Sequence, residues 1–126
     1  MGSGQQVRLA RLPRPAIVNL WASWCPPCRA EMPAIQRYAA ANPGRVTVLG
    51  VDTGDTRAAA GSVVADIGIG YPNLYDPDKR LLAALGYSSL PVTLFIDRTG
   101  TIRHRYQGQP LTEQSLTQLA TRYLGS

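Results

Sequence analysis

The residues best suited to chemistry in this sequence are Cys25 and Cys28, which are separated by two prolines. They follow a short apolar run, residues 17–21, and precede a stretch with helical periodicity. The N-terminus of a helix carries partial positive charge, which stabilises a thiolate, the form of cysteine that attacks a disulfide. Cys25 is therefore the expected nucleophile. Cys28, nearly one turn later, can attack Cys25 and release a partner from a mixed disulfide.

Two other uses of the cysteine pair stay open, a purely structural disulfide and a metal site. A structural disulfide would close a very short loop here, and such a loop constrains the unfolded chain little. A zinc site needs about four ligands, and the remaining soft ligand in the chain is His104, on a distant segment. Redox chemistry is the preferred interpretation.

The two prolines limit how strongly the Cys25 thiolate can be stabilised. Neither Pro26 nor Pro27 has a backbone N–H to donate to the sulfur. We therefore expect the pKa of Cys25 to lie below the free value of about 8.5, without reaching the strongly acidic range of potent oxidants.

The elements around the cysteines predict an α/β domain. Residues 17–21 are expected to form a strand buried on both faces, and the helix after Cys28 ends before Asn42. Pro33 lies inside that helix and is expected to kink it. Residues 45–52 predict a second strand, which the crossover rule makes parallel to the first.

The second half of the chain predicts five further elements. They are a helix at 56–67, an extended link at 71–75, a short helix at 79–85, a hairpin of 92–96 with 101–106, and an amphipathic helix at 112–124. Together the elements predict a mixed sheet of about four or five strands with helices on both faces.

The composition fits one globular domain. The chain has 126 residues, 44% of them hydrophobic, which is enough for a single core. The net charge is +5, but the basic residues are scattered, so nucleic acid is not an expected partner. Residues 1–5 are interpreted as an expression scar or linker and residues 6–126 as the folded domain. Membrane contact is expected only through an N-terminal anchor missing from this sequence.

Two segments carry a family resemblance. Residues 19–33, NLWASWCPPCRAEMP, resemble the active-site signature of the thioredoxin superfamily in its TlpA/ResA/CcmG (DsbE-like) branch. Residues 86–97 are similar to the segment that carries the superfamily's cis-proline, and the similarity extends over residues 7–124. The resemblance implies a thioredoxin-like fold with a TlpA-type central helical insert within residues 53–86. Relatives begin with a full β-hairpin, for which this chain offers only residues 7–12.

The resemblance also implies roles for residues near the cysteines. Pro91 would be the cis-proline that faces the disulfide and offers backbone to a substrate chain. Glu31 matches an acidic residue that tunes the thiols and moves protons, although a surface Glu near a helix N-terminus would also be favourable. Trp24 is expected to cover the disulfide and to offer an apolar face to partners. Substrate contacts are thus expected from Trp24, Pro26, Pro27, Leu90 and Pro91.

Three further residues are interpreted beside the expected site. Ordinary thioredoxins carry a buried Asp where this chain has Asn19, a departure that gives Glu31 a larger role. Trp21 is interpreted as core packing. His104 is interpreted as an exposed strand residue between two arginines, without a role.

The resemblance implies an extracytoplasmic thiol-disulfide oxidoreductase that reduces disulfides of proteins or peptides, with the cysteines of apocytochrome c as candidate substrates. A membrane electron donor of the CcdA/DsbD type would supply it, and a monomer is expected. The Cys25–Cys28 pair would be the redox centre, with no other cofactor and no metal. An oxidase that introduces disulfides into secreted proteins is the alternative. A non-catalytic binding module and a peroxidase are the rivals, although the Thr and Arg pattern of a peroxidatic cysteine does not accompany Cys25.

Overall fold

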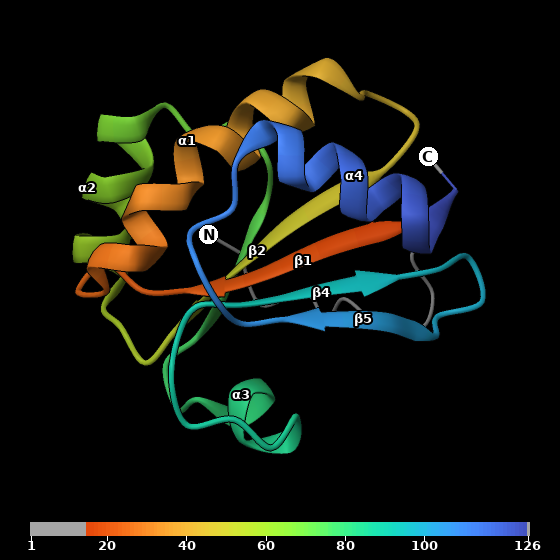
Figure 1. Cartoon of the computed structure of the whole chain (residues 1–126). Helices are drawn as coiled ribbons and strands as arrows, with labels where there is room; N and C mark the ends of the chain where they lie inside the picture. Colours follow the sequence, from red (N-terminus) through yellow and green to blue (C-terminus); the bar gives the residue numbers. More distant parts are fainter. Residues whose placement is uncertain (1–14, 126) are drawn as a thin grey trace.

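The computed structural model describes residues 15–125, and they form a five-stranded sheet in the order β3-β2-β1-β4-β5 (Figure 1). The strands are β1 (Ala16–Trp21), β2 (Thr47–Thr53), β3 (Asn73–Asp76), β4 (Val92–Ile96) and β5 (Ile102–Tyr106). The helices are α1 (Pro26–Ala41), α2 (Arg57–Ile67), α3 (Arg80–Ala84) and α4 (Glu113–Leu124). The interpreted scar at 1–5 and the reduced hairpin at 7–12 lie outside the described residues.

The sheet is mixed, as predicted. β1 pairs in parallel with β2, and β2 pairs in parallel with β3. β4 runs antiparallel to both β1 and β5. The central strand β1 is buried along its whole length, which confirms the strand predicted from its continuous apolar run. Its carboxyl end leads directly into the cysteine motif.

The prediction of an extended link at 71–75 is wrong in one respect. Residues 73–76 form strand β3, which pairs with β2. Gly50 of β2 lies opposite Asn73, and a Cβ added at Gly50 would overlap the Asn73 amide. The Trp21 indole N–H donates to Asn73 Oδ1 at 2.8 Å across the same space. The strand begins directly after Pro72, whose missing N–H costs nothing there.

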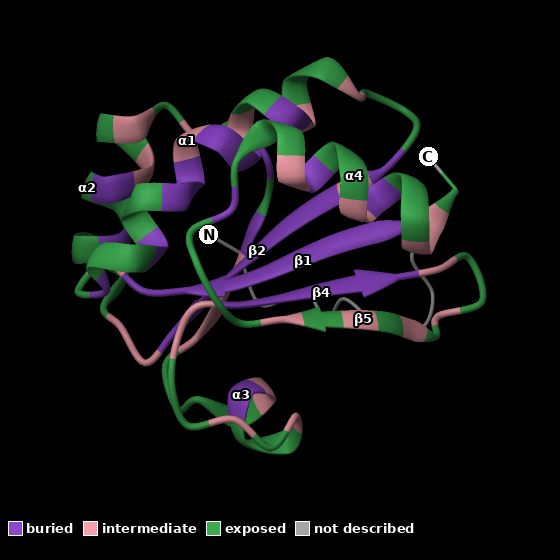
Figure 2. Ribbon diagram, viewed as in Figure 1, coloured by how far each residue is buried: buried purple, intermediate pink, exposed green. Residues whose placement is uncertain are grey.

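Helices cover both faces of the sheet, as predicted. α1, α2 and α4 lie on one face and α3 lies on the other (Figure 1). On the first face Ile17 and Phe95 pack with Leu116 of α4, and on the second Leu20 and Leu94 pack with Leu82 of α3. Burial is continuous in β1 and β4 and, after the partly buried Thr47, in β2, and it alternates between intermediate and exposed along the outer strand β5 (Figure 2).

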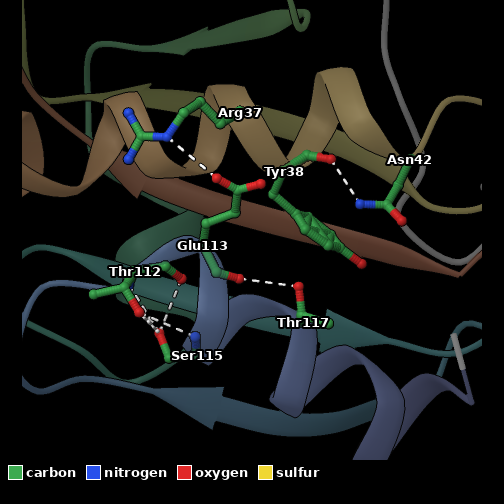
Figure 3. Close-up of polar contacts among 7 residues, drawn as sticks. All are labelled: Arg37, Tyr38, Asn42, Thr112, Glu113, Ser115 and Thr117. Atoms are coloured by element: carbon green, nitrogen blue, oxygen red, sulfur yellow. Dashed lines mark hydrogen bonds and ion pairs between the residues drawn. The ribbon is translucent and has the colours of Figure 1, made fainter.

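Polar contacts join α1 to α4 on the solvent side. Arg37 of α1 reaches Glu113 at the start of α4 in an exposed ion pair of 3.3 Å (Figure 3). Thr112 and Ser115 form a capping box that begins α4. α1 continues through Pro33 as one helix and ends at Ala41, followed by the C-cap Asn42, whose amide donates to the Tyr38 carbonyl at 2.8 Å. The predicted end of this helix is confirmed.

Candidate active site

The two cysteines form a disulfide at the point where β1 passes into α1. Cys25 is the N-cap residue of α1, and its Sγ accepts the backbone N–H of Cys28 at 3.3 Å. Pro26 and Pro27 occupy the first helical positions, where the missing N–H groups would have no partner within the helix. Cys25 is 4% exposed and Cys28 is fully buried, so Cys25 is the sulfur that a partner can reach.

The turn that presents Cys25 is held by the loop after β2. The Ser23 backbone N–H donates to Asp55 Oδ2 at 2.7 Å, and the Ser23 hydroxyl donates to Asp55 Oδ1 at 2.8 Å. The Trp24 indole N–H donates to the Gly54 carbonyl at 2.9 Å. Residues 22–24, which we name the presenting turn, are thus fixed by three hydrogen bonds to residues about thirty positions later in the chain.

Trp24 is the one large hydrophobic side chain of the described residues that stays exposed, at 56%. The Lys79 ammonium lies 5.9 Å from the centre of its ring. Pro26 and Pro27 are also exposed beside it. An apolar surface therefore adjoins the disulfide, and the roles in substrate binding expected for these three residues stay predictions.

The loop before β4 reaches the core cluster that contains the cysteines. The Leu90–Pro91 peptide bond is cis, as the resemblance implied. Leu90 is half-buried and packs against the cluster that contains Trp21, Cys25 and Cys28. The structure thus brings Leu90, the residue before Pro91, to the cluster that contains the cysteines, from a segment far away in the sequence. The role expected for Pro91 at the disulfide stays a prediction.

Glu31 is almost fully buried, so the alternative of a surface carboxylate near the helix N-terminus is wrong. It lies three residues after Cys28 on α1, which places both side chains on one face of the helix. Its Oε1 accepts the Asn19 amide at 3.0 Å, and its Oε2 accepts the Leu111 backbone N–H at 3.0 Å. Burial raises the pKa of Glu31, and these two hydrogen bonds partly oppose that effect.

Asn19 connects Glu31 to the sheet. Its amide N–H₂ group also donates to the Thr93 hydroxyl of β4 at 3.0 Å. Tyr71 belongs to the same region: burial, followed by the charge of Glu31, raises the pKa of its phenol. Asn19 Oδ1 and the Tyr71 hydroxyl are buried without a partner among the described residues. Sequence reasoning did not connect Tyr71, Thr93 or the Leu111 donor with Glu31, because these residues lie far from it along the chain.

A second buried carboxyl, Asp52, was also missed. It is the second-last residue of β2, lies directly opposite Trp21 in the parallel register and is fully buried. Burial, followed by the neighbouring Asp55 carboxylate, raises the pKa of Asp52 to about 8. The available signal was a charged residue at the end of an otherwise apolar strand.

His104 differs from its interpretation as a simply exposed residue. It is half-buried in β5, and its ring stacks on that of Tyr123 at 4.4 Å between centres. The metal alternative would need this histidine near the cysteines. Within residues 15–125, no group of three or more His, Cys, Asp or Glu side chains could hold a metal ion. Trp21 is buried in the core as predicted, with its indole N–H bound to Asn73.

No helix in the described part of the chain is long and apolar enough to cross a membrane.

Known proteins share both the sequence and the fold. A profile of the AhpC/TSA family matches residues 1–105. The thiol:disulfide interchange protein DsbE homolog of Paracoccus denitrificans is 39% identical over 110 residues, which are 86% of this chain and 59% of that protein. DsbE of Yersinia pestis is 34% identical over 116 residues, 89% of this chain and 60% of that protein. The chain therefore spans about three fifths of the length of these relatives.

A solved structure agrees. A secreted disulfide oxidoreductase of Mycobacterium tuberculosis, described as homologous to Escherichia coli DsbE, superposes with a TM-score of 0.79 and 28% identity. The match covers 89% of this chain and 84% of that one. The thioredoxin-like fold expected from the two motif segments is confirmed. The chain belongs to the AhpC/TSA family, as a thioredoxin-fold protein of its DsbE-like branch.

Proposed function

We propose that this protein is a thiol-disulfide oxidoreductase that reduces disulfides of partner proteins through Cys25 and Cys28. The observation that carries the proposal is the placement of Cys25 at the N-cap of α1, bonded to a buried Cys28. This geometry gives one reachable sulfur, in a position that favours its thiolate, and one protected sulfur beside it. The names of the relatives from Paracoccus and Yersinia support the same chemistry.

The reaction is a pair of thiol–disulfide exchanges. The Cys25 thiolate attacks one sulfur of the partner's disulfide; a Cys25–partner bond forms, the partner's own S–S bond breaks, and the released sulfur takes up a proton. Cys28 then loses its proton and attacks Cys25 Sγ, which releases the partner's second sulfur as a thiol. Two electrons pass to the partner, and the protein is left as the Cys25–Cys28 disulfide. A dithiol donor protein must then reduce it again.

Glu31 is the proposed proton acceptor for Cys28. Its carboxyl is buried on the same helix face as Cys28, and its raised pKa brings it closer to the pH at which proton transfer to and from a thiol is useful. The hydrogen bonds from Asn19 and Leu111 keep the carboxylate in place when it is charged. Glu31 thus combines a fixed position with a shifted pKa, the two properties expected of a general base.

The finer assignments rest on the resemblance and on the relatives. We propose extracytoplasmic action on protein or peptide dithiols and disulfides, with apocytochrome c cysteines as one substrate and a membrane donor of the CcdA/DsbD type. The Mycobacterium neighbour, described as secreted, supports the compartment. A monomeric state is proposed with them.

The reduction potential of the Cys25–Cys28 pair tests the direction of the reaction. The protein would be equilibrated with glutathione redox buffers and its dithiol fraction measured. We expect a value near or below that of thioredoxin, about −270 mV. A value near that of DsbA, about −120 mV, would assign the oxidase role and overturn the proposed direction.

Trapping the mixed disulfide tests the assignment of the two cysteines. The Cys28→Ser variant should accumulate a covalent complex with a disulfide substrate such as insulin, because no thiol remains to release it. The matched Cys25→Ser variant should form little complex, since its remaining thiol is fully buried. Equal trapping by both variants would contradict the order of attack.

A separate measurement addresses the peroxidase rival. Fast consumption of hydrogen peroxide by the dithiol form that depends on Cys25 would support it.

A further inference from the structure

Asp52 lies on the face of the sheet that carries the disulfide. Side chains alternate along β2, and Leu49 and Val51 pack on the α3 face, so Asp52 points to the opposite face. Its partner in the register is Trp21, which belongs to the same core cluster as Cys25 and Cys28. The Asp52 carboxyl is fully buried, and both of its oxygens lack a donor among the described residues.

Asp55, the neighbour of Asp52, is the residue that holds the presenting turn. Its Oδ2 accepts the Ser23 backbone N–H, and its Oδ1 accepts the Ser23 hydroxyl and the Thr56 backbone N–H, both at 2.8 Å. Burial alone would raise the pKa of Asp55, but the hydrogen bonds from Asp52, Ser23 and Thr56 outweigh it and lower that pKa. Asp55 is therefore a carboxylate whose oxygens act as acceptors.

The contact between the two carboxyls needs a proton. Two ionised carboxylates can only accept hydrogen bonds, and a buried pair of like charges is unfavourable. The raised pKa of Asp52 and the lowered pKa of Asp55 place the shared proton on Asp52. With that proton, one Asp52 oxygen donates to Asp55 and gains a partner, while the other oxygen stays without a donor among the described residues.

The charged and titratable groups around the pair come from each adjoining element. Arg57 at the start of α2 lies over the Tyr75 ring of β3 at 4.4 Å, and the Tyr75 hydroxyl donates to the Asp55 carbonyl at 2.8 Å. Lys79, before α3, lies beside Trp24. On the α1 side, the cluster that contains Trp21 also contains the cysteines, which do not titrate while bonded to each other.

We propose that Asp52 and Asp55 share one proton and act as a positioning pair, in which protonated Asp52 holds Asp55 against Ser23 and so fixes the turn that presents Cys25. When the proton leaves, Asp52 and Asp55 both carry negative charge. Their repulsion weakens the hydrogen bonds between Asp55 and Ser23. Attack on Cys25 then depends on a carboxyl that touches neither sulfur nor substrate. Only the kinetic part of this inference rests on the proposed function.

Carbon-13 NMR of the aspartate carboxyls tests the shared proton directly. The disulfide form would be titrated from pH 3 to pH 9.5, so that no cysteine contributes. We expect the Asp52 carboxyl carbon to titrate near pH 8, with the Ser23 amide moving at the same midpoint. In Asp52→Asn, which keeps a donor toward Asp55 but cannot titrate, the Ser23 step should disappear. The control Asp66→Asn, at an exposed position of α2, should keep it.

Two results would overturn the shared proton: an Asp52 carboxyl that titrates near its ordinary value of about 4, or a Ser23 step that persists in Asp52→Asn. The wild-type titration needs no variant, so it stays decisive even if Asp52→Asn fails to fold.

The rate at which dithiothreitol reduces the Cys25–Cys28 disulfide tests the positioning. After correction for the dithiothreitol thiolate fraction, we expect the wild-type rate constant to rise about three- to fivefold between pH 7 and pH 9, as a lost hydrogen bond frees the turn and exposes Cys25. Asp52→Asn should show a flat corrected profile. A flat wild-type profile beside a confirmed titration would refute the positioning role. This reagent is no protein partner, so failure of the proposed function on protein substrates would be seen separately.

Discussion

Glu31 and Asp52 show how two buried carboxyls near one disulfide acquire different properties from their donors. Glu31 receives hydrogen bonds from Asn19 and Leu111, which stabilise its charged form against the cost of burial. Asp52 receives none from the described residues and borders another carboxylate. Burial raises both pKa values, but only Glu31 has partners that would hold it as an anion.

The Glu31→Gln variant tests the proton-transfer role. We expect the rate of insulin reduction to fall about 10²-fold, because a neutral amide cannot accept the Cys28 proton. The limb of the pH–rate profile that Glu31 contributes should disappear, which a purely structural effect would not cause. The control Glu113→Gln, at the exposed start of α4, should leave both unchanged. A profile of unchanged shape in Glu31→Gln would contradict the role.

At this scale the sequence predicts residues whose partners are close in the chain. Cys25 and Cys28 could be assigned by type and spacing, whereas the roles of Glu31 and Pro91 were implied by the resemblance of the two segments that contain them. The role of Asp55 could not be predicted, because its partner Ser23 is thirty-two positions away and the sequence near either residue does not indicate the pairing. The donor Leu111 contributes only a backbone N–H, which carries no sequence signal at all.

At the scale of elements, the position of β3 depends on one missing side chain. Gly50 leaves the space in which Asn73 meets the Trp21 indole, and its backbone N–H donates to the Pro72 carbonyl at 2.9 Å. The sequence predicts an extended, proline-containing link at 71–75 rather than a strand. Tertiary contact with β2, rather than local preference, makes this segment a strand.

The segment 53–86 contains α2, β3 and α3. Its correspondence to the family's central insert stays a prediction.

The Gly50→Ala variant tests this dependence. The added Cβ would displace the Asn73 amide and break its hydrogen bond with Trp21, so we expect the free energy of unfolding to fall by about 1–3 kcal/mol. Gly61→Ala is the matched control, since its Cβ would enter open space within α2. That change should raise the free energy of unfolding by up to about 1 kcal/mol. Urea unfolding of both variants measures the difference, and equal effects would contradict this account.

At the scale of the whole molecule, the acidic groups near the site make folding stability depend on pH. The folded state raises the pKa of Asp52 and Glu31 above their unfolded values, so it binds these protons more tightly than the unfolded chain. The stability they provide is fully present below about pH 4 and is lost as the pH rises, for Asp52 through about pH 8. Asp55, whose pKa is lowered, contributes in the opposite sense.

Chemical unfolding of the disulfide form at pH 5, 7 and 9 measures this effect. We expect the wild-type free energy of unfolding to decrease across the series, and Asp52→Asn to show a smaller decrease because its amide does not titrate. Asp66→Asn serves as the control that keeps the wild-type slope. Parallel slopes in wild type and Asp52→Asn would show that Asp52 titrates normally in the folded protein.

The burial of the sulfur pair has a consequence for the traffic of electrons. Because Cys28 is fully buried and Cys25 is only 4% exposed, small thiols and dissolved oxidants have little access to either sulfur. A partner must instead bring its own sulfur to the small exposed part of Cys25, next to the exposed Trp24. For a protein with the proposed function, this enclosure limits the loss of electrons from the dithiol to small thiols and oxidants in solution, so that they pass to partner proteins instead.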